Sequence, residues 1–234
     1  MAAKQRRNLA VRVTSRETAW GYLYLIASLF LLPALLQWCN ALLPTPLSKV
    51  WFNFIYFVIN FCFVFLIFIN FYRRSLAYIG QNIPDFLLAT VIGFCLYMAA
   101  NWVLSAIIYH ALPDYSNLND HSVAQMAQDN FWVSALGAVL LVPLAEESLH
   151  RGLIFGSLYP KNHALAYAVS TIIFSVVHIA GYIGVYDPIA LAIAFVQYLP
   201  AGLVLAWAYR KSGSIFAPIL IHTAINAVGM FSLR

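Results

Sequence analysis

Residues 131–158 read FWVSALGAVLLVPLAEESLHRGLIFGSL, an apolar run that contains two adjacent glutamates, Glu146 and Glu147. The run is long enough to cross a bilayer as a helix, which needs about 20 predominantly apolar residues. Ionisable side chains at membrane depth are costly and rare, and each one is by default a candidate for function. This stretch therefore predicts a membrane-embedded helix with a functional site inside it.

The rest of the chain has the composition of a membrane protein. Of the 234 residues, 63% are hydrophobic and 9% are charged, whereas a typical soluble domain carries about 25% charged residues. Apolar runs recur on both sides of residues 131–158, so we expect an all-α polytopic membrane protein with seven transmembrane helices. The expected spans are 19–43, 50–72, 86–109, 131–158, 163–182, 188–209 and 214–233.

Basic residues indicate the orientation of these spans. Residues 1–18 are expected to form a basic cytoplasmic segment that precedes a single transmembrane domain, 19–234, because cytoplasmic loops carry an excess of Lys and Arg. The basic residues that fall on the expected cytoplasmic side are Lys4, Arg6, Arg7, Arg12, Arg16, Arg73, Arg74, Lys161, Arg210 and Lys211. The expected outer loop 110–130 instead carries Asp114, Asp120 and Asp129 and no Lys or Arg. The net charge of +5 thus indicates contact with the lipid bilayer, and no nucleic-acid partner is expected.

Two smaller features complete the expected architecture. Residues 118–130 look amphipathic and predict a short surface helix before the fourth span. The three cysteines, Cys39, Cys62 and Cys95, are widely spaced in apolar segments. We expect them to be small core residues rather than disulfide partners or metal ligands.

Three fragments hold the polar side chains of the last spans. They are Glu146-Glu147-x-x-x-Arg151, Phe174-x-x-x-His178 and His222-x-x-x-Asn226. On a helix, Glu147 and Arg151 are one turn apart, so Arg151 can neutralise Glu147, while Glu146 points about 100° away. Glu146 is then free to face a cavity as a general base. The alternative is that the Glu147–Arg151 ion pair only holds two helices together.

The spacing of these residues predicts that they meet. Glu146 and His178 each lie sixteen residues from Asn162, so in an antiparallel hairpin they face each other about 24 Å from the turn. His222 lies about 15 Å beyond the turn at residues 211–213. It reaches the depth of Glu146 and His178 if the hairpin that turns at Asn162 projects about 9 Å into the cytoplasm. A lone buried histidine is more often a hydrogen-bonded core residue, but two at the same depth as a glutamate favour a site.

The strings EESLHR, FSVVH and HTAIN, in this order, resemble the three-motif signature of the CAAX protease and bacteriocin-processing family, also called the Abi or type II CAAX prenyl endopeptidase family. The resemblance covers a motif core at about 131–230. It implies that Glu146 and His178 activate a water, that His222 and Asn226 stabilise an oxyanion, and that Glu147 and Arg151 support the geometry. Phe174 is expected to be a packing residue that shapes the pocket. The family pattern implies eight spans with both termini in the cytoplasm, whereas seven spans place the C-terminus outside.

The resemblance implies an intramembrane peptidase of the glutamate type, in a prokaryotic plasma membrane, that cleaves membrane-associated peptides or protein tails. No cofactor is expected; Glu146, His178 and His222 could bind zinc, but the chain has no HExxH motif. One alternative is a non-enzymatic immunity or partner-binding protein of the same fold. A second is a small transporter, which would more often show inverted repeats. Oligomeric state and the use of prenylated substrates are left open.

Overall fold

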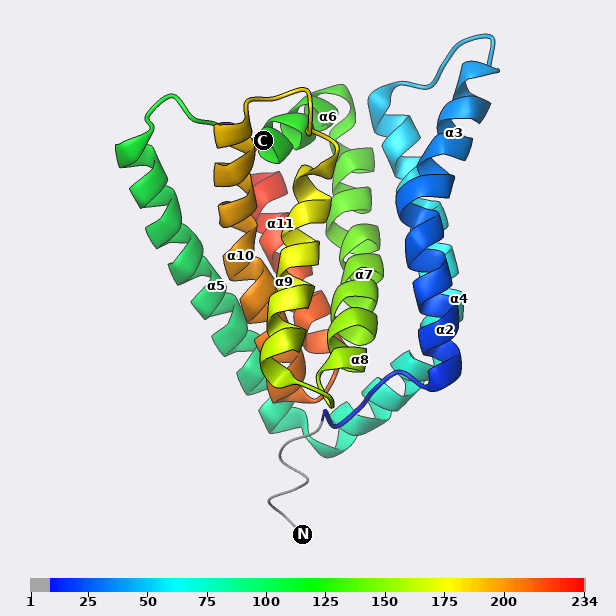
Figure 1. Cartoon of the computed structure of the whole chain (residues 1–234), viewed down its shortest axis with the longest axis vertical. Coiled ribbons are helices and arrows are strands. Elements are labelled where there is room, and N and C mark those ends of the chain that lie inside the picture. The colour runs from blue at the N-terminus through cyan, green and yellow to red at the C-terminus, as the bar shows by residue number, and fades with distance from the viewer. Residues whose placement is uncertain (1–8, 234) are drawn as a thin grey trace.

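The structure is a computed structural model that describes residues 9–233, and those residues form a bundle of helices without any strand (Figure 1). The expected all-α, polytopic class is confirmed. Its helical elements are α2 (Ser15–Ile26), η1 (Ala27–Leu31), α3 (Leu32–Ala41), α4 (Lys49–Gln81), α5 (Ile83–Ala111), α6 (Leu118–Ala135), η2 (Leu136–Leu141), α7 (Val142–Glu147), η3 (Ser148–Phe155), α8 (Gly156–Leu158), α9 (His163–Ala180), α10 (Pro188–Ser212) and α11 (Phe216–Phe231). The η segments are π-helical.

These elements join into seven apolar helices at the places where the sequence predicts spans. Within the described residues, six helices are long and apolar enough to cross a membrane: Ser15–Ala41, Lys49–Gln81, Ile83–Ala111, Leu118–Leu158, His163–Ala180 and Pro188–Ser212. The last, Phe216–Phe231, has 16 residues and a length of about 24 Å, somewhat less than the hydrocarbon core. An eighth span, as the family pattern implies, is not found between residues 9 and 233.

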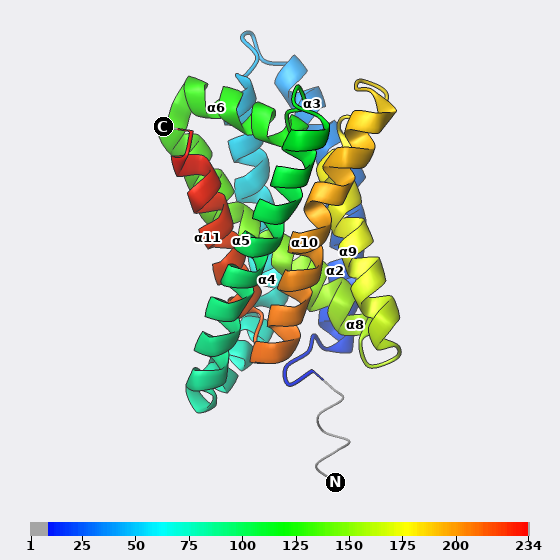
Figure 2. The same cartoon turned by 90° about the vertical axis from the view of Figure 1, so that its left-hand side faces the viewer.

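Successive helices run in opposite directions, so α2 begins and α11 ends at opposite ends of the bundle (Figures 1 and 2). The end where α2 begins also holds the end of α4, the turn between α8 and α9, and the end of α10. The basic residues at this end are Arg12, Arg16, Arg73, Arg74, Lys161, Arg210 and Lys211, whereas Lys49, at the start of α4, lies at the opposite end. The loop before α6 lies at the other end and carries Asp114. We call these the basic end and the acidic end. Lys4, Arg6, Arg7 and Arg234 lie outside the described residues, and a cytoplasmic basic end stays a prediction.

Asn130 divides the fourth long helix into two parts. Its φ of −154° and ψ of 97° are not helical, and its Oδ1 accepts a hydrogen bond from the Val133 amide at 3.2 Å. Asn130 therefore caps a second helix, as polar side chains do at helix N-termini, and the membrane span begins near Phe131, as expected. The preceding part of α6 forms the predicted short helix and lies across the acidic end (Figures 1 and 2).

The π-helical segments widen the helix next to its sites of strain. Segments η1 and η2 end just before Pro33 and Pro143; a proline ring clashes with the carbonyl four residues earlier, and a wider turn relieves this clash. Segment η3 has no proline and follows directly after Glu146 and Glu147. π-Helical segments occur frequently at functional sites, so η3 makes the backbone next to the glutamate pair unusual, while both glutamates themselves lie in the α-helical α7.

The expectation that the cysteines are core residues is wrong. Cys39, Cys62 and Cys95 are all exposed on the outer surface of the bundle. The physical reason is that lipid tails are as apolar as a protein core, so an apolar run does not reveal which of its faces is buried. Trp102 shows the same effect, with 73% of its surface exposed.

Helices α9 and α10 approach each other closely at Gly202. A Cβ atom at this position would lie 2.5 Å from Thr171 Cγ2 and 3.1 Å from the Thr171 backbone Cα. Small residues allow such backbone approach between helices in membranes. The contact fixes the spacing of two helices that both carry residues of the site described below.

Cysteine labelling tests the orientation of the bundle. With the three native cysteines replaced by serine, we expect Asp114→Cys to react with a membrane-impermeant maleimide on intact bacterial spheroplasts. Lys161→Cys should react only after permeabilisation, because one span separates the two exposed positions. The reverse pattern would invert the predicted orientation, and labelling of both from one side would contradict the crossing at residues 131–158.

Substitution of glycines tests the α9–α10 contact. We expect Gly202→Ala to lower the free energy of unfolding in detergent by about 1–3 kcal/mol, the usual cost of overpacking. The matched control is Gly229→Ala in α11, where a Cβ would meet nothing within 4 Å and alanine favours the helix by about 1 kcal/mol. Equal thermal unfolding curves for the two variants would show that close approach at Gly202 is not required.

Candidate active site

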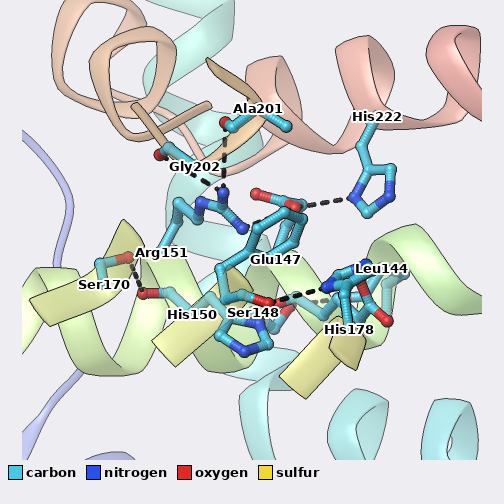
Figure 3. A network of polar contacts seen from close by, with 12 residues as sticks. Leu144, Glu147, Ser148, His150, Arg151, Ser170, His178, Ala201, Gly202 and His222 are labelled. Carbon is cyan, nitrogen blue, oxygen red and sulfur yellow. Dashed lines mark hydrogen bonds and ion pairs between the residues drawn. The ribbon is translucent and has the colours of Figure 1, made fainter. Parts of the chain in front are cut away.

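The Glu147 carboxylate joins the helix of the first motif to α11, which carries the third motif. Its Oε1 accepts hydrogen bonds from Arg151 Nη1 at 3.0 Å and from His222 Nδ1 at 2.8 Å (Figure 3). Glu147 and Arg151 are fully buried, and His222 is 5% exposed. The predicted Glu147–Arg151 pair is thus present, and it also holds the histidine of the third motif.

Arg151 is held on three sides. Its Nη2 lies 3.4 Å from each of the carbonyl oxygens of Ala201 and Gly202 in α10. Its guanidinium lies over the Phe174 ring, 4.1 Å from the centroid, which is a cation–π contact. A buried cation is tolerated only when it is paired and hydrogen-bonded, and Arg151 obtains these partners from its own helix, α9 and α10 together.

Glu146 faces a different partner. Its Oε2 lies 3.7 Å from His178 Nε2, a distance too long for a direct hydrogen bond. The side chains of Glu146 and His178 are 26% and 14% exposed, so they are more accessible than the Glu147 pair. Oε2 has no hydrogen-bond partner among the described residues. The two neighbouring glutamates therefore differ sharply: one is bound in the core, and the other is free towards a histidine.

The partners of the two histidines define where their protons lie. His178 Nδ1 is 2.8 Å from the Phe174 carbonyl oxygen, which can only accept, so Nδ1 carries a proton and donates. His222 Nδ1 faces the Glu147 carboxylate in the same way. In the neutral form of each ring, Nε2 is therefore free of a proton and can act as an acceptor. For His178, this bare nitrogen is the one directed at Glu146.

Phe174 does more than the packing role expected for it. Besides its contact with the Arg151 guanidinium, the Phe174 ring lies near three histidine rings. The distances between centroids are 4.3 Å to His178, 5.3 Å to His150 and 6.0 Å to His222. It is 2% exposed. A single buried aromatic ring thus contacts the side chains of the first and second motifs and approaches that of the third, which gives the FSVVH string a physical reason to contain phenylalanine.

His150 also lies beside the site residues, although the sequence predicted no role for it. His150 is 3% exposed, and its Nδ1 donates to the Glu146 carbonyl oxygen at 2.8 Å. The Ser170 hydroxyl of α9 donates to the His150 carbonyl oxygen at 3.0 Å (Figure 3). The signal was available, because His150 lies four residues after Glu146 and so shares its helix face. His150 adds a further polar residue to those around Glu146.

Asn226 makes its hydrogen bond to a residue outside the three motifs. Its Nδ2 donates to the Ala138 carbonyl oxygen in η2 at 2.8 Å. One amide hydrogen of Asn226 is thus used to join α11 to the π-helical turn, and the second hydrogen remains for other partners. The structure pairs Glu146 with His178 and Glu147 with His222, and the catalytic roles of these residues and of Asn226 stay predictions.

The arrangement also bears on metal binding. From the sequence, Glu146, His178 and His222 are the expected ligands if the protein uses a metal ion. Between residues 9 and 233, no three side chains of His, Cys, Asp or Glu lie close enough together to share a metal ion. His222 directs Nδ1 at Glu147 rather than towards Glu146. Independence from metal remains a prediction for the experiment below.

Comparison with known proteins points to one family. Residues 128–228 match the family model described as Type II CAAX prenyl endopeptidase Rce1-like, and this confirms the resemblance recognised from the motifs. The UPF0177 protein YxdF of Lactococcus lactis subsp. lactis (strain IL1403) is 28% identical over 95 residues, 41% of this chain and 47% of that protein. The UPF0177 protein YbdJ of the same strain is 26% identical over 149 residues, 62% of this chain and 59% of that protein. The chain thus spans about half the length of these curated relatives, and no solved structure matches it.

Neutralising the two glutamates should separate stability from chemistry. We expect Glu147→Gln to lower the free energy of unfolding by about 3–5 kcal/mol, because it leaves the buried Arg151 cation unpaired. The double variant Glu147→Gln/Arg151→Met should recover part of this loss. The matched control is Glu146→Gln, which should unfold like the wild type, since its Oε2 has no protein hydrogen bond to lose. Equal destabilisation by the two single variants, measured by thermal unfolding in detergent, would contradict the division between the glutamates.

Proposed function

We propose that this chain is an intramembrane peptidase of the glutamate type, which cleaves membrane-associated peptides or protein tails. The match of residues 128–228 to an endopeptidase family supports hydrolysis of peptide bonds in general. The observation that carries the proposal for this chain is the geometry of Glu146 and His178, whose Oε2 and Nε2 atoms face each other across 3.7 Å.

This geometry suits the activation of a water molecule. A carboxylate oxygen and a proton-free Nε2 are both acceptors, so a water between them can donate one hydrogen to each, and a general base can act through such contacts. As the water oxygen attacks the carbonyl carbon of the peptide, one of its protons passes to the Glu146–His178 pair. The new C–O bond converts the carbonyl into a tetrahedral intermediate with a negatively charged oxygen.

His222 and Asn226 are proposed to stabilise that oxyanion. Asn226 has a second amide hydrogen beyond the one bound to Ala138, and amide donors serve this role in acyl transfer. His222 Nε2 can donate only when the ring carries a second proton, because Nδ1 already holds one and donates it to Glu147 Oε1 at 2.8 Å. Collapse of the intermediate breaks the C–N bond, and the leaving amine takes the proton held by the Glu146–His178 pair.

The embedding of the site limits the substrate. Glu146 and His178 belong to helices that are long and apolar enough to span a bilayer, so the scissile bond must reach membrane depth. An extended peptide or the tail of a membrane protein can do so, whereas a folded soluble protein cannot. The substrate proposed is therefore a flexible, membrane-associated segment.

Purified protein tests the proposal on a panel of membrane-anchored peptides, with products identified by mass spectrometry in water enriched in ¹⁸O. We expect the wild type to form products whose new carboxylate carries ¹⁸O. Glu146→Gln should lower turnover by about 10²–10⁴-fold, the contribution typical of a general base. The control is Glu17→Gln, which removes another largely buried glutamate, the partner of Arg74, on α2 and outside the three motifs.

Two outcomes would contradict this function. Full turnover by Glu146→Gln would reverse the assignment of the base, if Glu147→Gln loses turnover although it is folded to the same extent. Absence of cleavage across the panel would favour the immunity or partner-binding alternative. One tightly bound zinc per chain, required for activity, would overturn the prediction that the reaction needs no metal.

A further inference from the structure

Two aromatic rings from different helices contact the His178 ring. Phe174, one turn earlier on α9, has its ring centroid 4.3 Å from that of His178, with 49° between the planes. Tyr198 of α10 lies at the same distance, 4.3 Å, with 31° between the planes. The two aromatic rings are themselves 6.4 Å apart at 74°. His178 therefore meets a ring from its own helix and a second, more nearly parallel ring from its neighbour.

The hydrogen bond of His178 does not by itself fix the ring. Its Nδ1 donates to the Phe174 carbonyl oxygen, which holds one atom, but rotation about the bond to an imidazole ring is broad. A second contact on the ring face is needed to hold Nε2 in one direction. Tyr198 supplies that contact from α10, and offset contacts of aromatic rings have preferred geometries.

Close packing of α9 and α10 brings Tyr198 within reach. Tyr198 precedes Gly202 by four residues and so shares its helix face, and Thr171 precedes His178 by seven residues and shares its face in the same way. Gly202 meets Thr171 at backbone distance. The Tyr198–His178 contact is thus the next contact along the same antiparallel interface, and it depends on the absence of a side chain at position 202.

We propose that Tyr198 is a positioning residue, whose ring holds His178 so that Nε2 stays directed at Glu146. This role rests on the peptidase function proposed above. The role belongs to the ring and not to the phenol hydroxyl, because the contact with His178 is made between the two rings, whose planes are tilted by 31°. Nothing in the spacing of the three motifs assigns a part in the site to α10, which contains no motif residue.

Kinetics of three variants test the proposal. We expect Tyr198→Leu to lower kcat by about 10- to 100-fold, the scale on which misplaced catalytic groups cost activity, while KM stays unchanged. Tyr198→Phe should restore nearly all of kcat because it keeps the ring. The control is Trp207→Leu, which removes a half-buried aromatic ring on the same helix and should leave kcat unchanged. If Tyr198→Leu does not give a folded protein, Tyr198→Met takes its place.

A spectroscopic measurement tests the same role without any cleavage assay. In ¹⁵N-histidine NMR of the full chain in lipid nanodiscs, the His178 signals are those lost in His178→Gln. We expect a single tautomer with the proton on Nδ1 in the wild type and in Tyr198→Phe, and a mixture of tautomers or broadened signals in Tyr198→Leu. An unchanged tautomer and unchanged kcat in Tyr198→Leu would overturn the positioning role, and so would an equal loss in Tyr198→Phe. A peptidase assay that fails while the tautomer responds as expected would count against the function alone.

Discussion

The buried carboxylate of Glu147 is the interaction on which the rest of the site depends. It compensates the fully buried Arg151 cation and orients His222 through the same oxygen. Since a charge in the core is stable only with its partner, Glu147, Arg151 and His222 have to be brought together by the same folding event. Phe174 and two α10 carbonyls complete the surroundings of Arg151, so α7, α9, α10 and α11 all converge on one ion pair.

Much of this arrangement could be predicted from the sequence, for simple reasons. The apolar runs predicted the helices, because a segment that crosses a bilayer needs about 20 apolar residues and has to satisfy its backbone hydrogen bonds internally. Helical periodicity was enough to pair Glu147 with Arg151, and counting residues from the turn at Asn162 was enough to place Glu146 opposite His178. These are local or hairpin relations, in which the chain distance fixes the spatial distance.

The remaining features depend on contacts between helices that periodicity does not encode. The sequence does not state that His222 binds Glu147 rather than Glu146, since this follows from the rotation of α11 against α7. It does not show that Tyr198 reaches His178, which depends on the close approach at Gly202. The cysteines were misplaced for a related reason: the lipid-facing and core-facing sides of a membrane helix are equally apolar, so hydrophobicity cannot separate them.

The two histidines illustrate two ways of orienting an imidazole inside an apolar bundle. His222 is oriented by a carboxylate, as histidines in hydrolytic sites often are, and that carboxylate needs Arg151 as a buried counter-ion. His178 is oriented by a backbone carbonyl and by two aromatic rings, which bring no further charge into the bundle. A second buried carboxylate behind His178 would require its own cation at a high desolvation cost. Aromatic contacts avoid that cost and leave Glu146 as the one carboxylate of the site without a charged group hydrogen-bonded to it.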